Sequence, residues 1–319
     1  MILLLKNKTL NKYRTIWESD KEQFLKLLYN EKIFKQYPHP ECEFLTFPRW
    51  EIVADKSEVK KTLKENFSSK GRGGQYQAGL PSTTVVVDTL YPVDLKKERF
   101  KLSWLNNVSE EDFYNQEEKN KESMNLGTYL HKILELYLLS ELPKHKKDVR
   151  IFVEQARSDK EVLKIFPDFE ERRIALETMV AETVSEFISR ELCEYICLGS
   201  EIFFNTGRLQ GTVDMVGLKS GCIAIQDFKS TRKSYPNGTP KFTSPNDMDS
   251  YVRQLCSYKM ALEETAFISP IDIKNLEFKV YQFNLLNCKY KIFKKSSEEV
   301  LGWEDSINCV LNWFHESVG

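Results

Sequence analysis

The chain has 319 residues, of which 41% are hydrophobic and 29% charged, a composition typical of a globular protein with a substantial core. Its formal net charge is −1, which excludes an overall basic field, so a polyanion could be held only by local cations or a metal ion. The seven cysteines are scattered and form no CxxC pair, which excludes a dense disulfide framework and favours a reducing, intracellular setting.

Residues 1–75 are expected to form an N-terminal extension, and residues 76–319 the main domain. The apolar run Met1–Leu5 stops at Lys6, so it is too short for a signal peptide or a membrane span and predicts a first strand. The glycine-rich segment 68–74 marks the boundary, either as a plain linker or as a mobile basic loop that touches phosphate. Apolar spacing predicts the other elements of this extension: a helix over 19–36, a strand pair over 44–53 broken at Pro48, and a lysine-rich helix over 58–66.

A basic stretch with interleaved aromatic residues follows, at Lys96, Lys97, Arg99, Phe100 and Trp104. Such a stretch suits single-stranded nucleic acid, because bases stack on aromatic rings while cations pair with phosphates. A solvated helix with its aromatic residues in the core would show the same pattern, so both interpretations stay open.

A long helix is predicted over 117–142, with apolar residues at helical spacing and Pro143 as its stop. Gly127, His131 and Glu135 are spaced four residues apart, so they stack on one stripe of this helix. A lone histidine beside an apolar face is most often only a packed side chain, and its interest depends on acidic residues downstream. Two further helices are predicted, over 149–165 and 169–197.

The most informative segment is a predicted β-hairpin, in which the apolar strands 209–218 and 222–228 flank the turn Lys219-Ser220-Gly221. Together with its neighbours, this hairpin predicts an α/β fold with a central mixed sheet of about four to six strands flanked by helices. The neighbours are a strand over 198–205, a long loop over 230–248, a helix over 249–265, strands over 276–285 and 288–293, and a helix over 297–316.

Three charged residues of the hairpin suggest chemistry. Asp227 and Lys229 point to the same face of their strand, and the hairpin can bring Asp214 beside them. Two carboxylates on apolar strands repel each other and resist burial unless a divalent cation binds both, and Mg²⁺ and Mn²⁺ prefer oxygen ligands. The ammonium of Lys229 could then orient an attacking water or stabilise charge on a phosphate. A surface hairpin with exposed charges is the alternative.

Four short motifs, in this order, resemble the RecB-like branch of the PD-(D/E)XK nucleases over roughly residues 80–290. They are G-x-x-x-H at Gly127 and His131, G-x-x-D at Gly211 and Asp214, D-x-K at Asp227 and Lys229, and Q-x-x-x-Y at Gln254 and Tyr258. Within the branch, the chain is most similar to the group of the mitochondrial genome maintenance exonuclease, with phage exonucleases nearby. The shared features are a Pro-Ser-x-Thr opening and a glutamate four residues after the histidine, here Pro81, Ser82, Thr84 and Glu135.

The resemblance implies a PD-(D/E)XK core and a metal-dependent DNA exonuclease that prefers single strands or ends, acting in replication, recombination or repair. Lys229 would position the attacking water, and Glu201 would touch the metal through water. The implied ligands of Mg²⁺ or Mn²⁺ are His131, Asp214, Asp227 and the backbone carbonyl of Phe228. The residues expected to brace the site or contact the substrate are Gln254, Tyr258, Ser230, Thr231, Lys96, Lys97 and Arg99.

The chain also departs from the family pattern. Gln226 stands where a proline usually precedes the second acid. Members with an iron–sulfur cluster carry three clustered cysteines near the C-terminus, whereas Cys256, Cys288 and Cys309 are dispersed, so no iron–sulfur cluster is expected. Because no Walker A loop is present, we expect a stand-alone nuclease or one subunit of a complex. Its expected partners are DNA and a helicase or single-strand-binding protein, without a membrane, in the cytoplasm or, for a viral protein, the host cytoplasm.

Two other functions compete with an exonuclease. A structure-specific endonuclease would use the same site and differ only in accepting a strand without ends. A catalytically idle DNA-binding scaffold is the alternative from another class. The intact set of Asp214, Asp227 and Lys229 argues against the scaffold.

Overall fold

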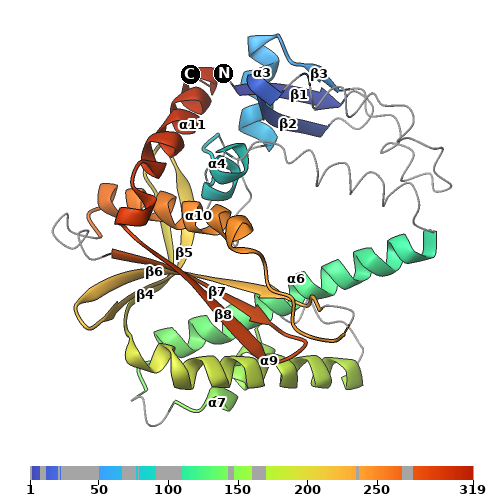
Figure 1. Ribbon diagram of the computed structural model, residues 1–319, viewed down its shortest axis with the longest axis vertical. Helices are drawn as coiled ribbons and strands as arrows, with labels where there is room; N and C mark the ends of the chain where they lie inside the picture. The colour runs from blue at the N-terminus through green and yellow to red at the C-terminus, as the bar shows by residue number, and fades with distance from the viewer. Residues whose placement is uncertain are drawn as a thin grey trace. The chain divides into compact units, whose positions relative to one another are not determined.

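The computed structural model of the protein describes residues 2–7, 12–20, 22, 50–66, 77, 79–90, 110–142, 147–159, 170–234, 237–267 and 276–318 (Figure 1). The chain divides into two compact units. The first consists of Met1–Glu118, Gly207–Gln210 and Asp305–Gly319, and the second of Lys119–Thr206 and Gly211–Glu304. Lys96, Lys97, Arg99 and the glycine-rich segment 71–74 lie outside the described residues, as does the predicted boundary near residue 75.

The first unit contains a small antiparallel sheet in the strand order β2-β1-β3. Its first strand confirms the strand predicted from the apolar start of the chain, and α3 confirms the predicted lysine-rich helix. Ser82 caps α4, because its hydroxyl accepts a hydrogen bond from the backbone N–H of Val85 at 3.4 Å. The elements are β1 (Ile2–Asn7), β2 (Lys12–Trp17), β3 (Trp50–Ile52), α3 (Lys56–Asn66), α4 (Thr83–Leu90) and the greater part of α11 (Trp303–Val318).

The second unit is built on a five-stranded sheet in the order β4-β5-β6-β7-β8. The β5–β6 and β7–β8 pairs are antiparallel and the β6–β7 pair is parallel, which confirms the predicted mixed sheet. The strands are β4 (Ile196–Asn205), β5 (Gln210–Lys219), β6 (Cys222–Thr231), β7 (Leu276–Asn284) and β8 (Lys289–Ser296). The helices are the greater part of α6 (Glu110–Leu139), together with α7 (Val149–Arg157), α9 (Glu170–Arg190) and α10 (Pro245–Glu264).

The predicted hairpin is present as β5 and β6. Lys219 pairs with Cys222 across a two-residue turn, in which Ser220 and Gly221 have φ angles of 50° and 80°. Two successive positive φ angles give a turn whose twist matches that of the flanking strands, and glycine adopts them without steric cost. The turn therefore fixes the register that aligns the two strands as far as the candidate site.

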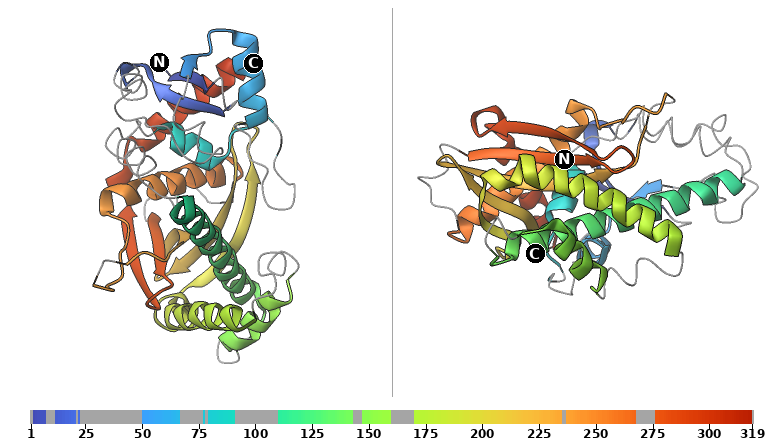
Figure 2. Two further views of the ribbon diagram at one scale, coloured as in Figure 1. Left: turned by 90° about the vertical axis from the view of Figure 1, so that its right-hand side faces the viewer. Right: turned by 90° about the horizontal axis from the view of Figure 1, so that it is seen from below.

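One face of this sheet carries the main hydrophobic core. Phe228 of β6 and Tyr281 of β7 pack there against Phe187 of α9, with ring centroids 5.9 Å and 4.8 Å from the Phe187 ring. Leu130 and Ile133 of α6 are fully buried in the same cluster. Figures 1 and 2 show α6 and α9 on the same side of the sheet. This packing fixes α6, which carries the histidine, against β6.

Several predicted ends of helices and loops were wrong, because a helix cap, a strand or a helix begins at a different residue than expected. The helix predicted over 149–165 ends at Arg157, where the backbone N–H of Ser158 caps the carbonyl of Gln155. The helix predicted over 169–197 ends at Arg190, because residues 192–194 form a 3-10 turn and β4 begins at Ile196. The loop predicted over 230–248 is shorter, since β6 runs to Thr231 and Pro245 opens α10 at a position that proline favours. Within the described residues, every helix is too short or too polar to cross a bilayer.

Candidate active site

The hairpin places the two predicted aspartates next to each other. The β5–β6 ladder runs to the pair Met215 and Gln226, and the next residues are Asp214 and Asp227. Asp214 also takes the place of a ladder acceptor, because its Oδ2 accepts a hydrogen bond of 2.7 Å from the backbone N–H of Phe228. The carboxylate of Asp214 is therefore tied to β6 at the point where the two strands carry their acids.

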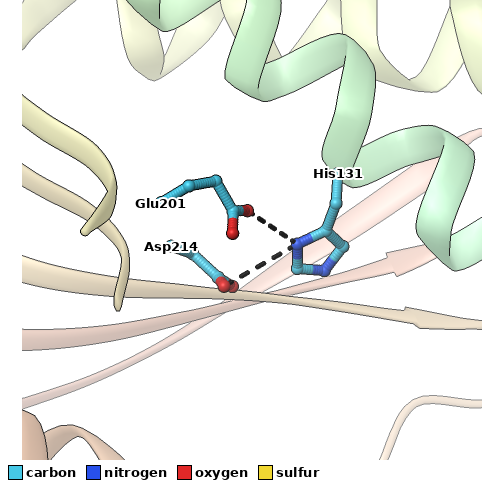
Figure 3. Close-up of side chains that lie close together, drawn as sticks. All are labelled: His131, Glu201 and Asp214. Carbon is cyan, nitrogen blue, oxygen red and sulfur yellow. Dashed lines mark ion pairs between the residues drawn. The ribbon is translucent and has the colours of Figure 1, made fainter. Parts of the chain in front are cut away.

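His131 of α6 faces this part of the hairpin from the side. Its Nε2 lies 2.7 Å from the carbonyl oxygen of Phe228. Its Nδ1 lies 3.7 Å from Oε1 of Glu201 and 3.7 Å from Oδ1 of Asp214 (Figure 3). A carbonyl can only accept a hydrogen bond, so Nε2 carries a proton and Nδ1 is the nitrogen that faces the two carboxylates.

The charges around Nδ1 call for a cation. Burial alone would lower the pKa of His131, but the negative charges of Asp214 and Glu201 outweigh it and raise the pKa above its ordinary value. In the neutral tautomer, the lone pair of Nδ1 would point at two carboxylates and be repelled by them. Either a proton on Nδ1 or a metal ion bound between the three groups removes this repulsion.

Glu201 reaches the site through an unusual backbone conformation. It lies within β4 with a φ angle of 49°, which residues with a Cβ rarely adopt inside a strand. The neighbouring Ser200 donates a hydrogen bond of 3.0 Å from its hydroxyl to the backbone carbonyl of Asp214. Such conformations cost roughly 1–3 kcal/mol and are found mainly where function requires a particular side-chain direction. Here the direction is toward His131 and Asp214.

Asp227 and Lys229 form an ion pair beside this group, with Nζ 2.7 Å from Oδ1 of Asp227. Burial raises the pKa of the Asp227 carboxyl to about 6, although the charge of Lys229 opposes the shift. The pKa of Lys229 is raised as well, because Asp227 and Asp214 outweigh the effect of its burial. The second oxygen of Asp227, Oδ2, is buried without a hydrogen-bond partner among the described residues.

A divalent metal fits the residues present. One donor atom from each of His131, Glu201 and Asp214 lies within 4.8 Å of the other two. Ligand bonds of about 2.0–2.6 Å place two ligands of one ion at most about 5 Å apart. The donor set of one imidazole and two carboxylates, with the unpartnered Oδ2 of Asp227 on the neighbouring strand, also suits such an ion. Asp227 and the carbonyl of Phe228 lie outside the three-residue group, so their predicted roles as ligands stay predictions.

A close approach between α6 and β6 explains the glycine of the first motif. A Cβ on Gly127 would lie 2.7 Å from the hydroxyl of Ser230, which is shorter than real contacts of this kind. Two further contacts between the same segments lie on either side of it. His131 donates a hydrogen bond to the backbone carbonyl of Phe228, and Glu122 forms an ion pair with Arg232. The end of β6 therefore runs along α6, and the glycine allows the histidine to reach the hairpin.

The remaining predicted residues lie around the site in different ways. Gln254 donates a hydrogen bond to the hydroxyl of Tyr258 on α10, and Tyr258 is 3% exposed and packs on Phe204 of β4. The bracing role expected of the pair stays a prediction. Thr231 is buried, and its backbone carbonyl accepts a hydrogen bond of 2.9 Å from Leu285. Lys96, Lys97 and Arg99 fall on residues that the structure does not describe.

Sequence reasoning missed one aromatic contact. Tyr251 of α10 places its ring centroid 5.2 Å from Nζ of Lys229. Tyr251 lies three residues before Gln254, so the two share one side of the helix. This three-residue spacing to Gln254 was the signal that could have placed Tyr251 near the site. No pattern in the sequence indicated which face of α10 would pack against β6.

Together, a mixed sheet, an Asp-x-Lys strand, a second aspartate on the hairpin and a facing histidine define the class of metal-dependent nucleases. The family model of the PD-(D/E)XK nuclease superfamily matches residues 97–308, and the chain belongs to this superfamily. Membership indicates a nuclease, and such nucleases generally use divalent metals. A search of the curated proteins found no match.

Proposed function

We propose that the protein is a metal-dependent exonuclease that cleaves phosphodiester bonds of DNA. The observation that carries the proposal is the meeting of His131, Glu201 and Asp214 beside the Asp227–Lys229 pair. Five ionisable groups on four different elements share one small region, which a purely structural role does not require. The superfamily membership is the independent support.

The residues that would hold Mg²⁺ or Mn²⁺ are His131, Asp214 and Asp227, with Glu201 touching it directly or through water. When bound, the metal would supply positive charge at the scissile phosphate and favour ionisation of water. The chain itself fixes the direction of the ligands. The Nε2 N–H of His131 donates a hydrogen bond to the backbone carbonyl of Phe228. The backbone N–H of Phe228 donates a hydrogen bond to Oδ2 of Asp214. These bonds orient both ligands before substrate arrives.

Lys229 would act by charge rather than by taking a proton. Asp227 and Asp214 raise the pKa of Lys229 despite its burial, which favours the charged ammonium form. A fixed ammonium can donate hydrogen bonds to the attacking water or to a phosphate oxygen as negative charge develops. Asp227 holds the ammonium in place through the hydrogen bond of 2.7 Å.

The preference for single strands or ends is the finer part of the proposal. The basic and aromatic residues at 96–104 and the RecB-like motifs support it, since aromatic rings stack unpaired bases. Replication, recombination or repair in the cytoplasm is the setting we propose, with a helicase or single-strand-binding protein as partner. Similarity to the mitochondrial genome maintenance and phage exonucleases belongs to the same proposal.

A pair of substrates tests the function and its polarity at once. A linear single-stranded DNA labelled at either end and a circular strand of the same sequence are incubated with the protein and Mg²⁺ or Mn²⁺. We expect mononucleotides or short products from the linear strand, an intact circle, and no cleavage in EDTA. Cleavage of the circle would instead show the endonuclease.

The matched control is Asp227→Asn, which keeps the size of the side chain and removes its charge. We expect this variant to bind the linear strand without cutting it. Binding of DNA without cleavage by the unaltered protein, with every divalent metal tried, would favour the scaffold and contradict the proposal.

A further inference from the structure

Tyr251 lies against the one lysine that the proposed chemistry uses. The ammonium of Lys229 is 2.7 Å from Oδ1 of Asp227 and 5.2 Å from the centroid of the Tyr251 ring. A cation within about 6 Å of a tyrosine ring is attracted by the negative face of the ring. Asp227 precedes Lys229 on β6, whereas Tyr251 belongs to α10, so the two contacts hold the ammonium from different elements.

The ring contact has an energetic reason. The Lys229 side chain is 26% exposed, so its ammonium is partly dehydrated. Among the described residues, the ammonium donates one hydrogen bond, to Asp227. An aromatic face stabilises the partly dehydrated charge without taking up another of its N–H groups, which stay available to water or phosphate. A carboxylate in the same place would bind an N–H group and repel the substrate.

The position of Tyr251 on α10 separates this contact from the packing of the helix. The core side of α10 is formed by fully buried residues such as Val252, Leu255 and Leu262. Tyr251 itself is only partly buried, unlike these three residues. Loss of its ring should therefore leave the helix packed and remove the interaction with Lys229.

We propose that Tyr251 is a positioning residue, whose ring holds the ammonium of Lys229 in place for the reaction. This inference rests on the proposed nuclease function for its kinetic consequence, but the contact itself is independent of that function. The proposal assigns α10 two roles: Tyr251 positions Lys229, and Gln254 and Tyr258 are expected to brace the sheet. The ring, and not the hydroxyl, is the part that acts.

Two substitutions separate the ring from the hydroxyl. Tyr251→Phe keeps the ring, and Tyr251→Leu keeps an apolar side chain but removes the ring. Cleavage of a linear DNA strand is measured at saturating metal, and kcat and KM are determined separately. We expect Tyr251→Leu to lower kcat by about three- to thirtyfold with little change in KM, and Tyr251→Phe to retain most of the turnover. A kcat that survives in the leucine variant, or falls equally in both, overturns the proposal.

A second measurement needs no activity. The protein is labelled with ¹³C at the ε position of lysine, and the Lys229 signal is assigned by its loss in Lys229→Arg. The ring current of Tyr251 should shift this signal upfield in the unaltered protein and in Tyr251→Phe, and Tyr251→Leu should abolish the shift. An unchanged signal in the leucine variant rejects the interaction, whether or not the protein is a nuclease. Cleavage by no form of the protein, with the shift intact, rejects only the proposed function.

Discussion

At the scale of single residues, the site is a set of groups that oppose one another without a cation. Asp214 is fixed by the N–H of Phe228, and His131 by the carbonyl of the same residue. Their free atoms then face each other at 3.7 Å. Their hydrogen bonds to Phe228 hold both side chains in this arrangement, which would suit a metal ion bound between them.

The first prediction concerns Asp214→Asn. The amide oxygen can accept the N–H of Phe228 while the amide NH₂ donates to Nδ1 of His131, so the metal-free variant should melt at the same or a higher temperature. Cleavage should fall by about two orders of magnitude or more, since one ligand is lost. Stabilisation by Mg²⁺ should fall with it, because that effect depends on binding to the native state. Thermal melting with and without metal checks this. Unaltered cleavage would remove Asp214 from the site.

The second prediction is the pH dependence of the metal-free protein. The pKa of Asp227 is about 6 in the folded protein, compared with 3.8 for an unperturbed group. A raised folded pKa contributes stability that is fully present below about 3.8 and is lost as the pH rises through about 6. Asp227→Asn removes this loss. In EDTA, the melting temperature of the variant relative to the unaltered protein should therefore rise between about pH 4 and pH 7. A difference that is constant over this range would contradict the burial of a charged Asp227.

At the scale of elements, the site depends on the seam between α6 and β6. The close approach of Gly127 and Ser230 lies between the His131–Phe228 bond and the Glu122–Arg232 ion pair. Helix propensity favours alanine over glycine by about 0.8–1.0 kcal/mol, so only this close approach disfavours a side chain at Gly127.

The third prediction is a double-mutant cycle at this seam. Gly127→Ala alone should give no gain in stability, because its Cβ meets the Ser230 hydroxyl at 2.7 Å. In a Ser230→Ala background, the same change should stabilise the protein by about 0.5–1 kcal/mol, since the obstructing atom is gone. Denaturant unfolding of the four proteins gives the coupling energy. Additive effects would show that the helix and strand do not approach as closely as described.

The elements themselves were largely predictable, because each has a local signal. The turn at Ser220-Gly221 and the apolar runs on either side of it predicted the hairpin, and Pro143 predicted the end of α6 near Leu139. The end of α9 was not predictable. Cys193 and Cys197 have helical spacing, but pairing within the sheet takes residues from Ile196 onward into β4.

The candidate site could be anticipated only in part. Spacing along the chain indicated that Asp214, Asp227 and Lys229 would meet, because a hairpin is a local structure. That His131 would face Glu201 depends on the positive φ angle of Glu201, which no residue type in β4 signals. The ring of Tyr251 over Lys229 depends on how α10 lies against the sheet, which is decided by packing over long sequence distances.

At the scale of the whole molecule, a chain with a net charge of −1 must gather its cations locally to hold DNA. The family match begins at residue 97, within the basic stretch that contains Lys97 and Arg99.

The first compact unit is assembled from three separate segments of the chain, and the proposed boundary near residue 75 remains a prediction.

The fourth prediction tests that basic stretch. Replacement of Lys96, Lys97 and Arg99 by alanine should weaken binding of single-stranded DNA and flatten its salt dependence by about 0.7 in slope for each phosphate that is no longer neutralised. Turnover at saturating DNA should change little, because these residues are not expected to touch the metal. Fluorescence anisotropy over a range of salt concentrations measures the slope. Unchanged affinity and slope would mean that the stretch is only a solvated face, and the nuclease assignment would stand.

The most direct test of the metal site is a crystal structure of the protein with Mn²⁺ and an anomalous difference map. The arrangement of His131, Glu201 and Asp214 predicts a single strong peak at this group, about 2.0–2.6 Å from Nδ1 of His131 and a carboxylate oxygen of Asp214. The same crystals of Asp214→Asn should lose the peak. A peak bound elsewhere, or none here at a Mn²⁺ concentration that supports cleavage, would contradict the assignment of this group as the metal site.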